Sequence, residues 1–267
     1  MNKEIEAVVN DSGGSGPALV FLHGFCESKA LWPDFTAPLV ADYRVVLIDL
    51  PGFGDNDQPQ PDYSMESAAA FVQQTLKALR INKSLVIGHS LGGYVALALA
   101  EQHPELLAGL VLFHSSALPD SEEKKDTRNK TMAFIQKQGL DTFMDTFVAP
   151  LFYEGNREAA KKAIALLTRI GKQTSEQAVL GTIVGMRDRP DRSPVLQGAT
   201  YPVLIIAGKQ DPAVPLEQTL QQCHLPRESH TLFLDQTGHM GMFEKPRETL
   251  LALQGFAARC FASSRKK

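Results

Sequence analysis

A serine bounded by glycines is the first feature of this sequence that could do chemistry. Gly88-His89-Ser90-Leu91-Gly92 fits the pattern G-x-S-x-G, in which a serine sits on a sharp turn. A serine hydroxyl is a weak nucleophile unless a neighbouring base accepts its proton. Imidazole suits that task, and a carboxylate can hold the imidazole in place. The pentapeptide also occurs in ordinary loops, so its meaning depends on the elements around it.

The segments on either side of Ser90 provide that context. Leu85-Val86-Ile87 is an apolar run, which predicts a buried strand, and residues 91–100 are rich in Ala and Leu, which predicts a helix. A strand that turns directly into a helix strains the serine backbone, and only small neighbours avoid a clash there. We therefore expect the Ser90 hydroxyl to lie at the tip of the turn, beside free N–H groups of the helix.

An acid and a base follow two later strands. Asp211 comes just after the predicted strand 201–208, and His239 follows the predicted strand 230–234. The carboxyl ends of parallel strands share one edge of a sheet, so Ser90, Asp211 and His239 should meet there. Asp235 is the alternative acid, but it precedes His239 within the same loop.

The rest of the chain alternates predicted strands and helices, which indicates a mainly parallel sheet with helices on both faces. We expect an edge strand at 4–9, further strands at 18–22, 44–50 and 107–113, and helices at 28–40, 64–79, 215–223 and 246–261.

The pattern changes in the middle of the chain. Between residues 118 and 197 no buried strand is evident, and helical stretches are expected at 121–138, 140–148, 156–170 and 175–187. The charged run 120–126 is interpreted as a solvated helix face.

Together these features resemble the α/β-hydrolase family over nearly the whole chain, the middle third being the least similar part. The resemblance rests on the turn around Ser90, the order serine–acid–histidine and the loop His23-Gly24-Phe25. It implies an α/β-hydrolase fold with a sheet of seven or eight strands. The core would comprise 1–117 and 198–267, with 118–197 inserted as a helical cap.

The resemblance also implies an oxyanion hole made by the backbone N–H groups of Phe25 and Leu91, which would stabilise a tetrahedral intermediate. His23 is expected to be structural. Apolar residues of the cap would face the serine and form an acyl or alkyl pocket. The residues expected to bind substrate are Trp32, His114, Phe147 and Met240.

Composition excludes several other classes of protein. The 267 residues are 43% hydrophobic and 21% charged with a net charge of −3, which is ordinary for a globular protein and gives no basis for binding nucleic acid. No apolar run reaches about 18 residues, so no membrane span is expected. The three cysteines are widely spaced, and no His/Cys/Asp set has metal-ligand spacing. We expect a cytoplasmic protein without metal or cofactor.

The leading hypothesis is a cofactor-free serine hydrolase that acts on a small-molecule ester. The same residues would serve an enol-lactonase, a thioesterase, a perhydrolase or a C–C bond hydrolase. A small-molecule receptor built on a hydrolase core is a rival from another class, and a hydroxynitrile lyase has no specific support. Haloalkane dehalogenases and epoxide hydrolases carry aspartate where this chain has Ser90, which argues against those activities.

Overall fold

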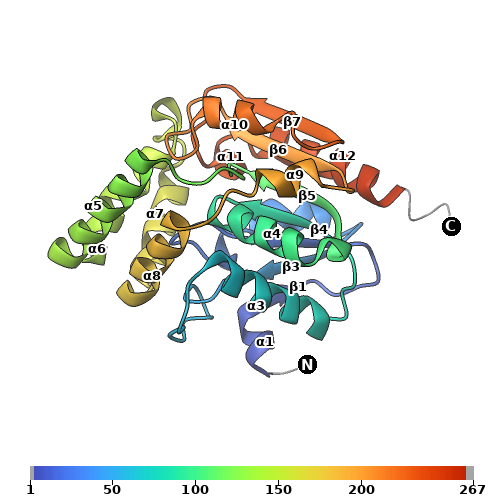
Figure 1. Cartoon of the computed structure of the whole chain (residues 1–267), viewed down its shortest axis with the longest axis horizontal. Helices are drawn as coiled ribbons and strands as arrows, with labels where there is room; N and C mark the ends of the chain where they lie inside the picture. Colours follow the sequence, from blue (N-terminus) through green and yellow to red (C-terminus); the bar gives the residue numbers. More distant parts are fainter. Residues whose placement is uncertain (1–2, 263–267) are drawn as a thin grey trace.

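The computed structural model describes residues 3–262, and a sheet of seven strands forms the centre of this part of the chain (Figure 1). The strand order is β1-β3-β2-β4-β5-β6-β7, and all neighbours are parallel except β1 and β3. The strands are β1 Val9–Asp11, β2 Ala18–Leu22, β3 Arg44–Ile48, β4 Ser84–His89, β5 Leu107–Phe113, β6 Val203–Gly208 and β7 Ser229–Leu234.

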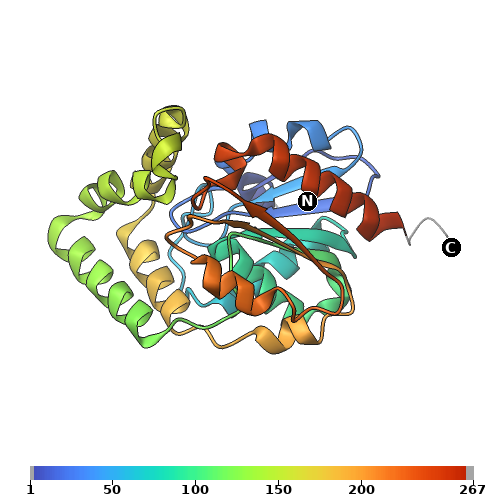
Figure 2. The same cartoon turned by 90° about the horizontal axis from the view of Figure 1, so that it is seen from above.

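Helices cover both faces of the sheet, so the central strands have no exposed side. Every residue of β2, β4, β5 and β6 is buried, in keeping with their continuous apolar sequences. Helix α12 lies on one face with the short α2, and α3, α4 and α10 lie on the other (Figure 2). Their bounds are α2 Pro33–Thr36, α3 Met65–Ala78, α4 Leu91–Gln102, α10 Leu216–Gln222 and α12 Pro246–Ala262.

The chain adds successive strands on opposite sides of β2, and this change of side determines where the site lies. After β2 the chain forms β3 on one side, then returns to form β4 on the other. Loops that leave the carboxyl ends of two such strands diverge and leave a crevice between them. The loop that begins at His23 follows β2, and Ser90 follows β4, so both border this crevice.

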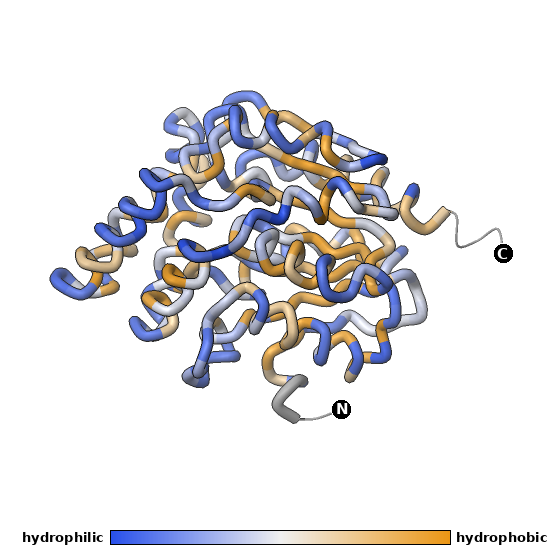
Figure 3. Tube along the Cα trace, in the orientation of Figure 1, coloured by the Kyte–Doolittle hydropathy of each residue, from blue (hydrophilic) through white to orange (hydrophobic). Residues whose placement is uncertain are grey.

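A group of helices occupies the segment between β5 and β6. Helices α5 to α8 of this group lie at one end of the molecule, at the left of Figures 1 and 2, whereas α9 lies beside the sheet and contacts α4. Figure 3 shows the central strands as mostly hydrophobic, whereas α5 is largely hydrophilic. Three helices begin and end within one residue of the predicted limits: α5 Glu122–Gln138, α6 Leu140–Phe147 and α8 Glu176–Arg187. Helix α7 Lys161–Lys172 begins five residues later than predicted, and α9 Ser193–Gln197 was not predicted.

Two sequence predictions about secondary structure were wrong. The edge strand expected at 4–9 is instead helix α1 Lys3–Val8 followed by the short β1, because Lys, Glu and Ala at its start favour a helix. The single helix expected at 28–40 is broken into α2 and two 3-10 turns. Pro33 is the first residue of α2 and Pro38 is the second residue of the turn Ala37–Leu39, and proline lacks the N–H that would continue a preceding helix.

Within residues 3–262, no helix combines the length and apolar character needed to cross a bilayer. Cys26, Cys223 and Cys260 are all free thiols.

Candidate active site

The turn at Ser90 has the geometry that a strained nucleophile requires. Ser90 has φ +50° and ψ −113°, and its side chain does not cap helix α4. A Cβ atom on Gly88 would come within 2.4 Å of the Gly92 carbonyl oxygen, and one on Gly92 would come within 2.4 Å of the Leu22 carbonyl oxygen. The two glycines are therefore needed for the turn to close, and the turn leaves the Ser90 side chain on the wall of a pocket.

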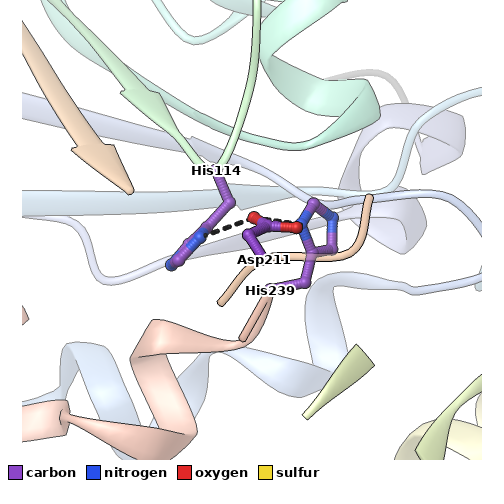
Figure 4. Close-up of side chains that lie close together, drawn as sticks. All are labelled: His114, Asp211 and His239. Carbon is purple, nitrogen blue, oxygen red and sulfur yellow. Dashed lines mark hydrogen bonds and ion pairs between the residues drawn. The ribbon is translucent and has the colours of Figure 1, made fainter. Parts of the chain in front are cut away.

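Asp211 and His239 form a buried pair at the ends of β6 and β7 (Figure 4). Nδ1 of His239 lies 2.8 Å from Oδ2 and 3.0 Å from Oδ1 of Asp211. Burial by itself would raise the pKa of the Asp211 carboxyl, but the facing histidines and their hydrogen bonds hold it well below its usual range. An ionised Asp211 accepts a hydrogen bond from the Nδ1–H group of His239, and the imidazole lone pair is then on Nε2.

The alternative acid, Asp235, is directed elsewhere. Its carboxylate lies 3.5 Å from Lys209 Nζ, and its side chain is 67% exposed. In contrast, Oδ1 of Asp211 also accepts the backbone N–H groups of Ala213 and Val214, at 2.8 and 2.9 Å. The structure thus pairs His239 with Asp211.

His114 lies behind Asp211, outside the pocket in which it was expected to bind substrate. Its Nδ1 is 3.0 Å from Oδ2 of Asp211 (Figure 4). Its Nε2 accepts the Gly241 N–H at 3.2 Å. Burial, only partly opposed by Asp211, lowers the pKa of His114 to about 4. The ring is therefore neutral, donates from Nδ1, and links the loop that carries Asp211 to the loop that carries His239.

A second buried histidine supports the site from below. His89 places Nδ1 3.0 Å from Glu27 Oε2 and Nε2 3.0 Å from the His239 carbonyl oxygen. Both partners only accept hydrogen bonds, so both ring nitrogens must carry protons. Burial alone would lower the pKa of His89, but the Glu27 carboxylate raises it. Burial likewise opposes the charge on Glu27, yet the facing His89 lowers its pKa.

This ion pair connects the base to the loop after β2. Oε2 of Glu27 also accepts the Gly24 N–H at 2.6 Å, while His23 accepts the Leu50 N–H at Nε2, 3.0 Å away. The geometry around His23 agrees with the structural role expected for it. Sequence analysis missed the His89–Glu27 pair, because the two residues lie 62 positions apart and no periodicity links them.

The two expected oxyanion donors border the crevice. Leu91 is the first residue of α4, and Phe25 lines the pocket beside Ser90. Among the hydrogen bonds formed within residues 3–262, none uses the backbone N–H of either residue. Both donors are therefore available to a bound group.

The pocket that holds Ser90 and His239 has a volume of about 280 Å³. Phe147, which was expected to contact substrate, lines it. Trp32 and Met240 do not: both side chains are completely buried, and Trp32 packs against Phe21 with ring centroids 5.2 Å apart. Both residues are close in sequence to residues of the site, but their side chains are buried in the core.

Several lining residues were missed by sequence analysis. Most come from the helices between β5 and β6, where the apolar pattern alone does not distinguish residues that face the sheet from residues that face a cavity. The missed residues are Glu27, Tyr94, Lys124, Thr127, Arg128, Thr131, Phe143, Leu151, Ile183, Met186, Ala213 and Val214.

The charged run 120–126 is also not wholly a solvated face. Asp120 is buried and binds two arginines, Arg128 and Arg189, and Lys124 lines the pocket.

Donor atoms of His114, Asp211 and His239 lie within 4.8 Å of one another, which raises the question of a metal site. However, both histidines direct Nδ1 at the same carboxylate over 2.8–3.0 Å, the length of a hydrogen bond. His114 donates from that atom and so has no Nδ1 lone pair for a metal. The three residues fit a hydrogen-bonded chain better than a zinc site, in which Zn–N bonds are about 2.0–2.1 Å.

The fold and the residues at its crevice define a hydrolase of the α/β type, and comparison with known proteins agrees. The family model described as alpha/beta hydrolase fold matches residues 17–246, so the chain belongs to the α/β-hydrolase fold family.

Individual relatives are hydrolases and esterases. A 2-hydroxy-6-oxo-6-(2'-aminophenyl)hexa-2,4-dienoic acid hydrolase of Metapseudomonas resinovorans is 25% identical, over 96% of this chain and 91% of that protein. A pimeloyl-[acyl-carrier protein] methyl ester esterase of Aeromonas hydrophila is 27% identical, over 91% of this chain and 96% of that protein. The solved structure of a thermophilic esterase from Thermogutta terrifontis superposes with a TM-score of 0.88 at 25% identity, covering 94% of this chain and 93% of that one.

A further similarity is local. An uncharacterised protein of Mycobacterium tuberculosis is 38% identical over 99 residues, a stretch that covers 37% of this chain but only 29% of that protein.

Proposed function

We propose that this protein is a serine hydrolase that cleaves small carboxylic esters through Ser90, His239 and Asp211. One observation carries the proposal: a serine on a strained turn and a histidine held by a buried carboxylate line the same pocket of about 280 Å³. A pocket of this size suits a small molecule. The proposed chemistry needs no group beyond the chain and water.

In the proposed mechanism, Nε2 of His239 accepts the Ser90 proton as the serine oxygen attacks the ester carbonyl. The oxyanion that forms accepts hydrogen bonds from the N–H groups of Phe25 and Leu91. The intermediate then collapses, and the alcohol leaves with the proton held by His239. His239 then accepts a proton from water as the water oxygen attacks the acyl-enzyme. The acid is released, and His239 returns the proton to the Ser90 oxygen.

We further propose that residues 118–197 act as a cap on a core made of 1–117 and 198–267. Support comes from the pocket lining, since α5, α6 and α8 all contribute side chains to the cavity that holds Ser90. The cap would exclude water from the acyl group and limit the size of the substrate.

The names of the relatives favour an ester as the bond that is cleaved. The Aeromonas hydrophila relative is a methyl ester esterase, and the Thermogutta terrifontis structure is that of an esterase. C–C bond cleavage is the second candidate, because the Metapseudomonas resinovorans relative is a dienoic acid hydrolase that aligns over 96% of this chain.

A fluorophosphonate probe tests the nucleophile. We expect a single label on Ser90, located by mass spectrometry of the digested protein. Ser90→Ala should abolish labelling and lower kcat by roughly 10³-fold or more towards short p-nitrophenyl esters. Ser116→Ala is the control, because Ser116 Oγ only caps the Leu118 N–H.

Two outcomes would contradict the proposal. Label on another serine would remove Ser90 as the nucleophile. Ester turnover close to zero in the wild-type protein, together with a ligand-dependent rise in melting temperature, would indicate a receptor instead.

A further inference from the structure

One face of helix α5 lines the pocket with polar side chains. Lys124, Thr127, Arg128 and Thr131 are spaced as i, i+3, i+4 and i+7, which places them along one side of a helix, and all four line the cavity that holds Ser90. The remaining lining is largely apolar and includes Phe25, Phe143 and Phe147. The pocket therefore has an apolar body and a polar side.

The charges near this polar side do not balance. Arg128 and Arg189 both bind one carboxylate, that of Asp120, and Arg189 reaches it over 2.6 Å. Burial opposes ionisation of Asp120, but the two guanidinium groups lower its pKa. Three cations, Lys124, Arg128 and Arg189, thus lie beside two acidic residues, Asp120 and the exposed Glu123, which lines an adjoining cavity.

Lys124 is the cation without an anionic partner. Its Nζ donates to the Ala213 carbonyl oxygen at 3.3 Å, and no carboxylate within residues 3–262 lies close enough to pair with it. The neighbouring Lys125 differs, since its Nζ lies 2.7 Å from Glu122 Oε1. Lys124 also borders a second cavity of about 630 Å³, so its ammonium group lies where the two cavities adjoin.

The carboxylates nearest the reacting atoms do not neutralise Lys124. Glu27 lines the pocket but is held by His89 at 3.0 Å, and Asp211 is held by His114 and His239. A cation on the wall of a partly enclosed cavity attracts anions more strongly than the same cation in open water.

From these contacts we infer that the substrate carries a carboxylate at the end remote from the ester bond, and that Lys124 selects it. The inference rests on the proposed ester hydrolysis and adds the class of ester. A volume of about 280 Å³ holds roughly ten non-hydrogen atoms, if each takes about the 30 Å³ of a liquid water molecule. The monoesters of four- to six-carbon dicarboxylic acids fit this description.

Matched pairs of esters test this assignment. Each pair at pH 7.5 consists of an anionic and a neutral methyl ester whose acyl chains have the same number of carbon atoms. The pairs are monomethyl succinate with methyl butyrate, monomethyl glutarate with methyl valerate, and monomethyl adipate with methyl hexanoate. A charge-assisted hydrogen bond corresponds to about 10- to 100-fold in affinity. We expect kcat/KM to favour the anionic ester of the best pair by about that factor, mainly through KM, and the preference to shrink as salt is added.

Three variants separate the role of Lys124 from a general effect of charge. Lys124→Met should bring the ratio of anionic to neutral kcat/KM close to one, and Lys124→Arg should retain most of the ratio. Lys125→Met is the matched control and should keep the wild-type ratio, because Lys125 pairs with Glu122 and does not line the pocket.

The outcomes distinguish this inference from the proposed function. Turnover of neutral esters without preference for the anionic ones, or a ratio that survives in Lys124→Met, would overturn the carboxylate assignment alone. Turnover of neither series would overturn ester hydrolysis and, with it, this assignment.

Discussion

Two histidines that were not expected to support the reaction determine where Asp211 and His239 lie. His114 links the two loops that carry them, and His89 binds the His239 backbone to Glu27. The first ring is neutral and the second is charged. His114 donates to Asp211, and His89 donates to Glu27 and to the His239 carbonyl oxygen, so each contributes to the preorganisation of the site.

Removal of His114 should alter the pH profile of the enzyme as well as its rate. His114→Asn tolerates the positive φ of +51° at this position but is too short to bridge both loops. Asp211 then loses a donor, its carboxylate interacts more strongly with a protonated His239, and the acidic limb of kcat/KM moves to higher pH. A lost hydrogen bond of about 0.5–1.5 kcal/mol corresponds to a shift of up to about one pH unit.

The measurement is kcat/KM between pH 5 and 9. His103→Asn is the control, since His103 is a solvent-accessible residue that pairs with Glu105. A limb that stays in place in His114→Asn would show that His114 does not act through Asp211.

The Glu27–His89 pair should make stability depend on pH. The raised pKa of His89 adds stability that is complete below its ordinary value of 6.5 and is lost as the pH rises through the folded-state value. The lowered pKa of Glu27 adds stability that is complete above 4.5 and is lost as the pH falls through its folded-state value. The contribution of the pair is therefore largest between these two ordinary values and declines on the alkaline side.

Urea unfolding of the wild type and of Glu27→Gln from pH 5 to 10 tests this expectation. Glu27→Gln should lower the free energy of unfolding near pH 6 by about 3 kcal/mol and flatten the alkaline decline. Glu105→Gln, at an exposed pair, should follow the wild type. An unchanged alkaline slope in Glu27→Gln would assign the decline to other groups.

At the level of single residues, the sequence predicted which residues lie near one another but not the direction of their side chains. Asp211 and His239 are in contact, and Ser90 lines the same pocket as His239, because each of the three follows a strand and the carboxyl ends of parallel strands meet. His114 also follows a strand, so its nearness was predictable. Its positive φ turns the ring behind Asp211, and no periodicity reports that dihedral.

At the level of elements, the long helices and buried strands were predictable because their apolar periodicity is strong. The segments at 4–9 and 28–40 failed because short elements at an edge depend on local residues: Lys and Glu at the first, Pro33 and Pro38 at the second. Which side chains of the inserted helices face the pocket could not be predicted, since that depends on how the helices pack against the sheet.

Helix α6 should set the limit on acyl chain length. Phe143 and Phe147 stack with ring centroids 4.8 Å apart, and Phe147 also meets Phe25 at 6.0 Å. Each added methylene gains about 0.8 kcal/mol, or about fourfold in kcat/KM, until the pocket is full. Phe147→Ala should move the optimum to a longer chain.

A series of p-nitrophenyl esters from acetate to palmitate measures this limit. Phe134→Ala is the control, because Phe134 is exposed and does not line the pocket. A wild-type kcat/KM that rises steadily to palmitate would contradict an enclosed pocket.

For the whole molecule, Arg192 joins the end of the inserted helices to the core. The Arg192 side chain is 3% exposed and binds Glu66 of α3 and Glu101 of α4, the latter over 3.1 Å. The backbone N–H of Arg192 donates to the Ala117 carbonyl oxygen at 2.8 Å. Arg192→Met should lower the free energy of unfolding by about 1.5–3 kcal/mol, because both glutamates lose a charged donor.

Urea unfolding at neutral pH measures the effect. Arg187→Met is the comparison, since Arg187 pairs with the adjacent Asp188 on the surface, and a change within about 0.5 kcal/mol is expected there. Equal losses in the two variants would show that Arg192 is no more than another surface charge.

The pairing of β5 with β6 has a consequence for how this scaffold can change over evolutionary time. Strand β5 ends at Phe113 and β6 begins at Val203, with helices α5–α9 between them in the sequence. The two strands nevertheless pair directly in the sheet. The entropy lost on closing a loop grows only with the logarithm of its length, so doubling the segment adds about 0.6 kcal/mol. Insertion, deletion or grafting of helices at this point would therefore leave the sheet intact, and new substrate preferences can arise there without a change in Ser90, Asp211 or His239, which lie outside this segment.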